Sequence, residues 1–324
     1  MNTTIASDRA AGCVCDSTGL ASRRGFLRAV AAAGVAAGLG APVLRGAEAG
    51  PGGRRRILVV FSKVHHNELG MDYRQTADSA AEAGFDGIDC PVRPGGQVLP
   101  ERVEEDLPRL AAILKERGLC LPKITTHITD LESAHAEKVL RVAARLGIRH
   151  YRLGTFTLPD RRAVPARLRE IQARFRDLAA LNRELGIQGL FQNHSGGNVG
   201  AEVWDAFETV RGYGASDLAL AFDIGHATAV LGDGWHAVLQ LVRSHIGVVY
   251  VKDHHRASRK WVALGEGDVD RRFFAVLKQM GYEGIFSQHF EYAVPGAKGP
   301  ELARNLQQAM RRDQETLRRW LAEA

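Results

Sequence analysis

From residue 56 onward, short apolar runs alternate with longer stretches in which apolar residues recur every three or four positions. A short apolar run is typical of a buried strand, and the longer period is typical of an amphipathic helix. The pattern predicts eight strands, at 57–62, 87–92, 120–127, 150–156, 188–194, 218–226, 247–254 and 284–292. Helices are predicted at 72–83, 101–116, 131–145, 164–185, 201–213, 235–244 and 271–280, and residues 300–324 close the chain.

Five of the predicted helices end on a glycine just before the next strand, at Gly84, Gly118, Gly147, Gly186 and Gly281. Glycine readily adopts the left-handed conformation that stops a helix, so these positions are C-cap signals. Strands that alternate with helices form a parallel sheet. Eight such units without a ninth predict a single α/β domain, a closed (β/α)8 TIM barrel. No G-x-G-x-x-G sequence follows the first strand, which argues against a dinucleotide-binding fold.

The N-terminal segment has the three parts of an export signal. Residues 22–28 (Ser-Arg-Arg-Gly-Phe-Leu-Arg) have the twin-arginine form, an Ala/Gly/Val-rich run follows at 29–41, and Ala-Glu-Ala stands at 47–49. The apolar run is too short to cross about 30 Å of hydrocarbon, so no stable membrane span is expected after cleavage. We therefore predict a twin-arginine signal peptide at 1–49, a barrel domain at 50–324, and a periplasmic or otherwise exported location.

Composition and charge narrow the choice of partners. The chain is 45% hydrophobic and 25% charged, which is ordinary for a globular protein, and its formal net charge is +6. Lys and Arg are interleaved with Asp and Glu, as in 101–117, which favours a solvated surface over a nucleic-acid patch. Cys90 and Cys120 lie in apolar runs and are predicted to be small core residues, with a disulfide between them as the less favoured alternative.

Polar side chains gather where the predicted strands end, which is the end of a TIM barrel that carries chemistry. These residues are His65, His66, Asp89, Arg93, Thr125, His127, Arg152, Gln192, His194, Asp223, His226, Lys252, Asp253, His255, His289 and Glu291. Six of the eight strand ends contribute a histidine, in a chain with twelve histidines. Dispersed surface histidines would not follow one end of the strands, so the convergence predicts an active site.

Some of these residues suit contact with a substrate. Asn193 and His194 precede a Ser-Gly-Gly-Asn loop that suits the close approach of a hydroxylated ligand. Arg93 and Arg152 carry guanidinium groups that suit a carboxylate or a phosphate. We assign these four residues and His127 to substrate binding.

Five segments occur in an order that resembles the xylose-isomerase-like barrel family, which includes sugar phosphate isomerases and epimerases. They are Phe-Gln-Asn-His at 191–194, Phe-Asp-Ile-Gly-His at 222–226, Tyr-Val-Lys-Asp at 250–253, Leu-Gly-Glu-Gly-Asp-Val-Asp at 264–270, and Ser-Gln-His-Phe-Glu-Tyr at 287–292. The resemblance covers residues 57–324 and implies the barrel fold.

The resemblance also implies a divalent metal held by Glu, Asp, His and Glu at the ends of the fifth to eighth strands. Asp223 matches the family position, whereas Gln192, Tyr250 and His289 stand where the family has Glu, His and Glu. The substitutions remove an anionic ligand and an imidazole. Gln192, Asp223 and His289 remain as the expected ligands, a set that suits a weaker or differently placed Mn, Mg or Zn ion.

The catalytic residues expected from the resemblance and the strand ends are Glu291, Lys252 and His226. Carboxylates in such a site move a proton between neighbouring carbons beside a carbonyl. Lys252 has two interpretations: it pairs with Asp253 at the barrel rim, or its charge stabilises an enolate or alkoxide. Glu291 lies two positions after His289, so a continuing strand would place both on one face.

The leading hypothesis is a carbohydrate isomerase or epimerase that moves a proton next to the carbonyl of a small sugar or sugar derivative. A 3-keto-glycoside lyase, which begins with the same proton abstraction, is an alternative. A degenerate sugar-binding barrel without catalysis is the third. The expected partner is a small-molecule carbohydrate and not a nucleic acid, and the oligomeric state is left open.

Overall fold

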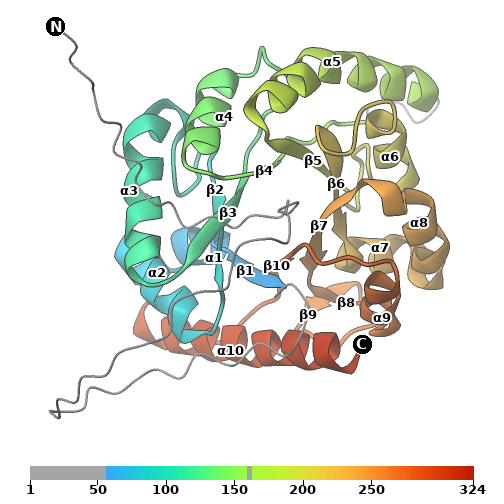
Figure 1. Ribbon diagram of the computed structural model, residues 1–324. Helices are drawn as coiled ribbons and strands as arrows, with labels where there is room; N and C mark the ends of the chain where they lie inside the picture. The colour runs from blue at the N-terminus through green and yellow to red at the C-terminus, as the bar shows by residue number, and fades with distance from the viewer. Residues whose placement is uncertain (1–55, 159–162) are drawn as a thin grey trace, which may run out of the picture. The chain divides into compact units, whose positions relative to one another are not determined.

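The computed structural model describes residues 56–158 and 163–324. The twin-arginine sequence and its cleavage site lie outside these residues. Eight parallel strands close into a barrel in the order β1-β10-β7-β6-β5-β4-β3-β2 (Figure 1), which confirms the predicted (β/α)8 fold. The strands are β1 (Ile57–Phe61), β2 (Gly87–Pro91), β3 (Cys120–Thr125), β4 (His150–Arg152), β5 (Gln188–Gln192), β6 (Leu218–Asp223), β7 (Ile246–Val251) and β10 (Ile285–Gln288).

Helices surround the barrel (Figure 1). They are α1 (Lys63–Asn67), α2 (Tyr73–Glu82), α3 (Val103–Glu116), α4 (Ala136–Arg145), α5 (Val164–Leu185), α6 (Trp204–Val210), α7 (Ile224–Leu231), α8 (Trp235–Val242), α9 (Arg272–Gln279) and α10 (Pro300–Glu323). Short 3-10 turns lie at Pro100–Arg102, Gly232–Gly234 and Arg243–His245. None of the helices in the described part of the chain is long and apolar enough to cross a membrane.

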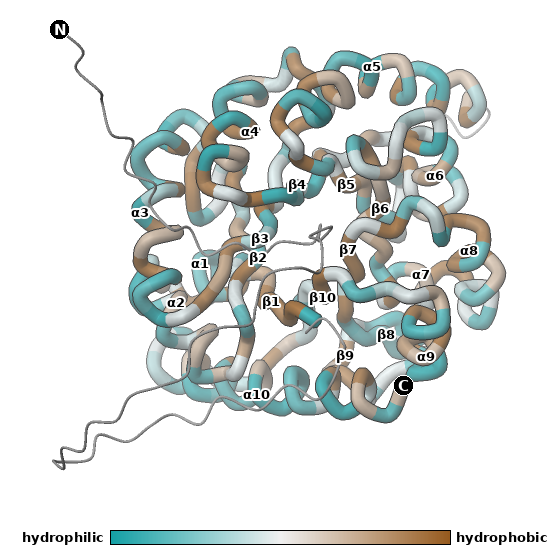
Figure 2. The backbone as a smooth tube through the Cα atoms, viewed as in Figure 1, coloured by the Kyte–Doolittle hydropathy of each residue, from teal (hydrophilic) through white to brown (hydrophobic). Residues whose placement is uncertain are grey.

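The core has two layers, one inside the barrel and one between the strands and the helices. Hydrophobic and hydrophilic residues alternate along the outer helices in Figure 2, because each helix buries one face only. On α10 that face includes Leu306, Met310 and Leu317. The barrel interior is filled by Val59, Leu190, Ala219, Ala221, Val248, Tyr250 and Ile285. Tyr250 belongs to this interior layer, which places it beneath the mouth of the barrel.

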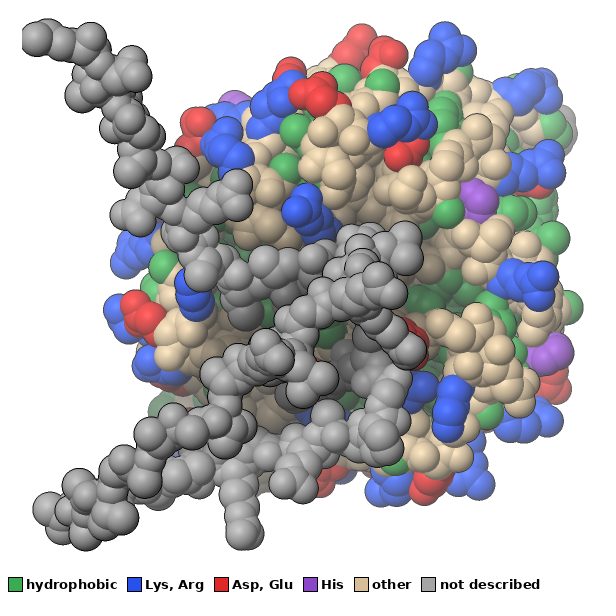
Figure 3. All heavy atoms as spheres, viewed as in Figure 1, with side chains coloured by type: hydrophobic (Ala, Val, Ile, Leu, Met, Phe, Trp, Pro, Cys, Tyr) green, Lys and Arg blue, Asp and Glu red, His purple; other side chains and the backbone are tan. Residues whose placement is uncertain are grey.

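The surface bears out the expected mixing of charge. In Figure 3, Lys and Arg side chains lie among Asp and Glu side chains around the periphery of the face shown. Arg141 on α4, for example, pairs with Glu137 on the same helix and with Glu184 on α5. Cys90 and Cys120 are not joined in a disulfide, and Cys90 is fully buried as predicted.

The structure corrects several predicted element boundaries. The sixth strand ends at Asp223, and the following residues form α7 instead of continuing the strand. Likewise β10 ends at Gln288, so His289 and Glu291 lie in the loop after it and not on one strand face. Besides α7, helix α1 and a hairpin of β8 (Asp253–His255) and β9 (Lys260–Val262) were not predicted.

Candidate active site

A buried ammonium group lies at the centre of the barrel mouth. Lys252 directly follows β7, and its side chain is 3% exposed. Its Nζ lies 2.8 Å from Glu291 Oε2, 2.8 Å from His226 Nε2 and 3.3 Å from Asp223 Oδ2. Three partners match the three hydrogens of an ammonium group. The three residues predicted to be catalytic therefore lie in contact, together with one of the predicted metal ligands.

Asp223 is held from two sides at the end of β6. Its Oδ1 accepts from the His226 backbone N–H at 3.0 Å and caps α7, while its Oδ2 accepts from Gln192 Nε2 at 2.8 Å. The Asn193 side chain donates to the Asp223 backbone carbonyl at 2.9 Å and accepts from its N–H at 2.6 Å. Both ends of the Asn193 amide are thus engaged. Asn193 therefore positions Asp223, and its contact with a substrate stays a prediction.

The glycine of the Phe-Asp-Ile-Gly-His segment makes room for Lys252. A Cβ atom on Gly225 would lie 2.6 Å from Lys252 Cγ and 2.7 Å from the Lys252 carbonyl oxygen. Real Cβ atoms essentially never approach so closely, so any larger residue would displace Lys252. Two of the five segments that suggested the family, 222–226 and 250–253, are therefore in direct contact.

His226 is a neutral imidazole. Burial, and next the charge of Lys252, lower its pKa far below the ordinary value. Its Nε2 lies 2.8 Å from Lys252 Nζ, and its Nδ1 lies 2.8 Å from Ser195 Oγ and accepts the Ser195 backbone N–H at 3.3 Å. Its ring lies 3.9 Å from that of His194 and meets Trp261 edge-on at 4.9 Å. His226 therefore ties the loop after β5 to Lys252.

Glu291 is the member of the cluster that faces open space. Burial opposes its ionisation, but the charge and hydrogen bond of Lys252 outweigh burial and lower the pKa of the carboxyl. Its side chain is 25% exposed. It lines a cavity of about 750 Å³ together with His194, Trp261 and Lys63. The site therefore presents an ionised carboxylate to a ligand, backed by a buried cation.

His289 lies deeper than Glu291. Its ring packs 4.7 Å from Phe61 and 4.4 Å from Tyr250 between ring centroids, and it is 5% exposed. Within the described residues neither of its nitrogens has a hydrogen-bond partner. Burial, and next the nearby Lys252, lower the pKa of His289 well below the ordinary value. The imidazole is therefore neutral and surrounded by aromatic rings.

The expected metal ligands do not fit a divalent ion in this arrangement. The ammonium of Lys252 already lies against Asp223, and Gln192 turns its N–H toward that carboxylate and its oxygen toward Arg152, at 2.7 Å. The charges nearest to His289 include Lys252 and Arg152, which would repel a cation. Residues 56–158 and 163–324 contain no group of three or more His, Cys, Asp or Glu side chains able to hold a metal ion.

The remaining predicted substrate residues form a basic sector across the mouth. Arg152 ends β4, while Arg93 and His127 follow β2 and β3. Burial, and next the charge of Arg152, lower the pKa of Arg93. Burial, and next the charge of Arg93, lower the pKa of His127. Arg93 therefore lies within electrostatic range of both Arg152 and His127.

Asp253 does not pair with Lys252; it organises the loop after the β8–β9 hairpin. Its carboxylate accepts the backbone N–H groups of His254 at 2.8 Å, Gly265 at 2.9 Å, Gly267 at 3.1 Å and Val269 at 3.0 Å. Glycine is required at Gly267, where a Cβ would lie 2.3 Å from Asp253 Oδ1. This contact explains why Lys-Asp and the later Gly-x-Gly sequence occur together.

A buried ion pair inside the barrel was not predicted from the sequence. Lys123 Nζ lies 2.5 Å from Asp89 Oδ2, and both side chains are fully buried. Thr125 and Ser287 complete the hydrogen bonding of this carboxylate. Burial lowers the pKa of Lys123 to about 8, against the opposing effect of Asp89. The sequence did contain a sign of this ion pair. Lys123 stands inside an apolar strand, where a charge needs a buried partner.

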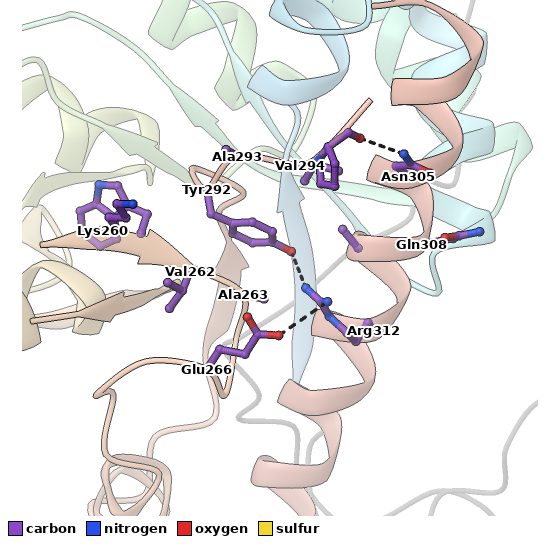
Figure 4. Close-up of a pocket in the computed structure, with 13 residues that line it drawn as sticks. Lys260, Val262, Ala263, Glu266, Tyr292, Ala293, Val294, Asn305, Gln308 and Arg312 are labelled. Carbon is purple, nitrogen blue, oxygen red and sulfur yellow. Dashed lines mark hydrogen bonds and ion pairs between the residues drawn. The ribbon is translucent and has the colours of Figure 1, made fainter. Parts of the chain in front are cut away.

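A second pocket of about 780 Å³ adjoins the cavity at Glu291 (Figure 4). Trp261 and Tyr292 line both. In Figure 4 the Tyr292 hydroxyl points toward Arg312 on α10, which donates to it at 3.1 Å. Trp261 also lies under Lys252, whose Nζ is 4.4 Å from the ring centroid. Trp235, by contrast, is a core residue that packs against Phe273.

Comparisons with known proteins show which family the chain belongs to. Residues 77–320 match the family described as Xylose isomerase-like TIM barrel. No curated protein matches the sequence. Among solved structures, the chain is similar to a 3-keto-D-glucoside 4-epimerase from E. coli at 16% identity and a TM-score of 0.63, covering 82% of this chain and 99% of that one.

Two other solved structures show the same likeness. A D-allulose 3-epimerase from Methylomonas sp. is 18% identical with a TM-score of 0.59, covering 83% of this chain and 99% of that one. A probable 3-DHS dehydratase from Bacillus anthracis is 14% identical with a TM-score of 0.62, covering 81% and 98%. At these identities the likeness concerns the fold, and the family match covers most of the barrel. The chain belongs to the Xylose isomerase-like TIM barrel family.

Proposed function

We propose that this protein is a carbohydrate isomerase or epimerase that moves a proton at a carbon next to a carbonyl. The observation that carries the proposal is Glu291, an ionised carboxylate that lines a cavity and is held by the buried ammonium of Lys252. Two structures of similar fold are named as sugar epimerases, which supports a carbohydrate substrate.

The geometry suggests a division of roles. Glu291 takes the proton from the carbon, the C–H electron pair forms a carbon–carbon double bond, and the carbonyl electron pair moves onto oxygen. Lys252 stabilises the resulting oxyanion with its positive charge. Protonation of the opposite face of the same carbon by a group other than Glu291 gives an epimer. Return of the proton to the neighbouring carbon, with transfer of that carbon's hydroxyl proton to the first oxygen, gives an isomer. His226, neutral and bonded to Lys252, keeps the ammonium in place.

No step in this scheme passes through a metal ion, because the ligand positions do not fit one. The rate at which the protein exchanges the substrate proton with solvent is therefore expected to be equal with EDTA and with added Mn²⁺, Mg²⁺ or Zn²⁺. An ion retained in stoichiometric amount by the purified protein, and lost in Asp223→Ala, would instead assign a metal to the site.

Incorporation of solvent deuterium tests the proposal directly. The full chain is incubated in D₂O with a panel of ketoses and 3-keto-glucosides, and exchange beside the carbonyl is followed by NMR. The wild type is expected to label at least one sugar, and Glu291→Gln, which keeps the side-chain size, is expected to lose labelling. No labelling of any sugar by the wild type would refute the proposal.

A lyase that cleaves 3-keto-glycosides is the second candidate. The observation that favours it is the second pocket, which shares Trp261 and Tyr292 with the cavity at Glu291 and offers room for a leaving group. Proton abstraction by Glu291 would be followed by loss of the group on the next carbon. Release of free aglycone from a 3-keto-glucoside, detected by chromatography, would select the lyase over the epimerase.

We also propose that residues 1–49 export the protein through the twin-arginine pathway. The paired arginines, the apolar run and the Ala-Glu-Ala sequence support this. Replacement of Arg23 and Arg24 by lysine is expected to retain the full-length chain in the cytoplasm on cell fractionation. Export of the variant at the wild-type level would contradict the proposal.

A further inference from the structure

We propose that the basic sector of the barrel mouth binds an anionic group of the substrate, a carboxylate or a phosphate, between Arg93 and Arg152. This inference rests on the proposed function, which it extends by naming the substrate class: an acidic or phosphorylated sugar derivative. The carbon that exchanges its proton would lie toward Glu291.

Strand register brings the two arginines to one sector. Arg152 is level with Thr125 across the β3–β4 pairing, and Thr125 is level with Pro91 across the β2–β3 pairing. Neighbouring strands are about 4.8 Å apart, so the ends of β2 and β4 lie within reach of two long side chains. The Arg93 guanidinium lies over the Phe61 ring at 5.8 Å, and Phe61 packs against His289. Arg93 is thereby held at the mouth.

Neither arginine is neutralised by the protein. Among the described residues, no Asp or Glu forms an ion pair with Arg93 or Arg152. The carboxylates close enough to influence Arg93 are Asp89 and Glu291, and each is bonded to a lysine instead. Many arginines on the outer helices, by contrast, have an acidic partner, as Arg141 does.

Polar atoms in this sector also lack partners. The side-chain hydrogen bond of Arg152 goes to the neutral oxygen of Gln192, and its buried Nε has no partner within the described residues. The buried Nδ1 of His127 is unpartnered in the same way. Buried polar groups are normally hydrogen-bonded, so the unpaired Nε–H of Arg152 beside two like charges indicates a ligand that accepts hydrogen bonds. A carboxylate or phosphate is such a ligand, and guanidinium groups bind it in a bidentate manner.

The basic sector is connected to the catalytic cluster. Arg152 donates to Gln192 at 2.7 Å, and Gln192 donates to Asp223 at 2.8 Å, which in turn contacts Lys252. A single side chain therefore separates the anion site from the carboxylates. A substrate anchored by its anionic group would place its next carbons toward Glu291, which gives the anion a positioning role.

Binding to the purified full chain tests the inference without relying on turnover. Calorimetric titrations with D-glucuronate, D-glucose 6-phosphate and D-glucose compare a carboxylate, a phosphate and a neutral sugar. The anionic probes are expected to bind at least tenfold more tightly than glucose, and less tightly as salt is raised. The better of the two anionic probes identifies the group.

Variants complete the test. Arg93→Gln and Arg152→Gln are each expected to weaken binding of the better anionic probe by about tenfold to 100-fold, the range for a hydrogen bond to a charged group. Arg145→Gln, with the same loss of charge on the exposed end of α4, is the matched control and should bind as the wild type does. In residues 56–158 and 163–324 the Arg93 side chain has no hydrogen-bond partner, so Arg93→Gln is expected to fold even if Arg152→Gln does not.

The inference is overturned if the neutral and anionic probes bind equally, or if Arg93→Gln binds the anionic probes as the wild type does. This failure differs from failure of the proposed function. Deuterium exchange into neutral ketoses with unchanged rates in Arg93→Gln would keep the enzyme and discard the anion site. Arginine-dependent binding of an anionic sugar without any exchange would keep the anion site and discard the proton transfer.

Discussion

At the scale of single residues, Lys252 carries the charge that lowers the pKa of Glu291 and forms an ion pair with Asp223 in one cluster. Lys252→Met keeps the aliphatic stem but leaves the two carboxylates without a cation. Removal of one partner from a buried ion pair costs about 3–5 kcal/mol. We expect the free energy of unfolding, measured by urea denaturation, to fall by about this amount, and solvent exchange to be lost.

A double variant separates the charge of Lys252 from its packing. In Lys252→Met with Glu291→Gln, one of the two unbalanced carboxylates is neutral, so part of the lost stability should return while exchange stays absent. If Lys252→Met alone is as stable as the wild type and still catalyses exchange, the ammonium does not hold the cluster together.

Gly225 gives a second test at the residue scale, because a larger side chain there would affect Lys252 by steric overlap. A methyl group at Gly225 would overlap Lys252 Cγ and the Lys252 backbone carbonyl. We expect Gly225→Ala to reduce the exchange rate at least 100-fold while circular dichroism shows a folded barrel. Gly234→Ala is the control, since its nearest neighbour is at an ordinary 3.4 Å from the added carbon. Equal exchange rates in the two variants would contradict the steric argument.

At the scale of elements, the loop after the β8–β9 hairpin depends on one carboxylate. Asp253 accepts four backbone N–H groups, three of them between Gly265 and Val269. Asp253→Ala would leave these donors without a partner, and each lost bond to a charged acceptor costs about 1.5–3 kcal/mol. We expect faster amide hydrogen exchange from Gly265 to Val269 and a fall in stability of several kcal/mol.

Asp268→Ala is the matched control for this loop. Its side chain accepts from a single backbone N–H, that of Arg256. Its replacement should leave the exchange of the amides from Gly265 to Val269 near the wild-type rate. Equal acceleration in both variants would show that loss of either acidic side chain loosens the loop, and that Asp253 has no special place.

Sequence periodicity predicted the elements well and their ends poorly, for a physical reason. The apolar run that contains β6 continues into Ile224, and a continuous apolar run does not distinguish a buried strand from a buried helix. The change occurs at Asp223, whose side chain caps the next turn and starts α7. The β8–β9 hairpin was missed because Asp253 holds it through contacts with residues a dozen or more positions away.

At the scale of the whole molecule, the rule that a TIM barrel carries its chemistry where the strands end predicted which residues meet but not how they pair. Asp223, His226, Lys252 and Glu291 were all placed at one end of the barrel from sequence, and they contact one another. That Lys252 would face Glu291 and not Asp253 depends on side-chain directions across three strands. The local sequence does not encode these directions, because they follow from closure of the barrel.

Buried imidazoles give the whole molecule a pH dependence. Burial lowers the pKa of His65 from 6.5 to about 4, and burial lowers that of His150 to about 4 as well. Between pH 6.5 and 4 the unfolded chain holds protons on these rings that the folded chain does not. The stability contributed by these neutral rings is therefore fully present above about pH 6.5. It is lost as the pH falls, by up to about 1.4 kcal/mol per pH unit for each ring.

His65 allows this pH dependence to be assigned. His65→Gln keeps a polar group near Ser79 but removes the titration, so the slope of unfolding free energy between pH 6.5 and 4.5 should decrease by about 1 kcal/mol per pH unit. Urea denaturation at several pH values gives that slope. His236→Gln, at an exposed position on α8, is expected to leave the slope unchanged. Equal slopes for wild type and His65→Gln would mean that this ring takes up its proton in the folded protein as readily as in the unfolded chain.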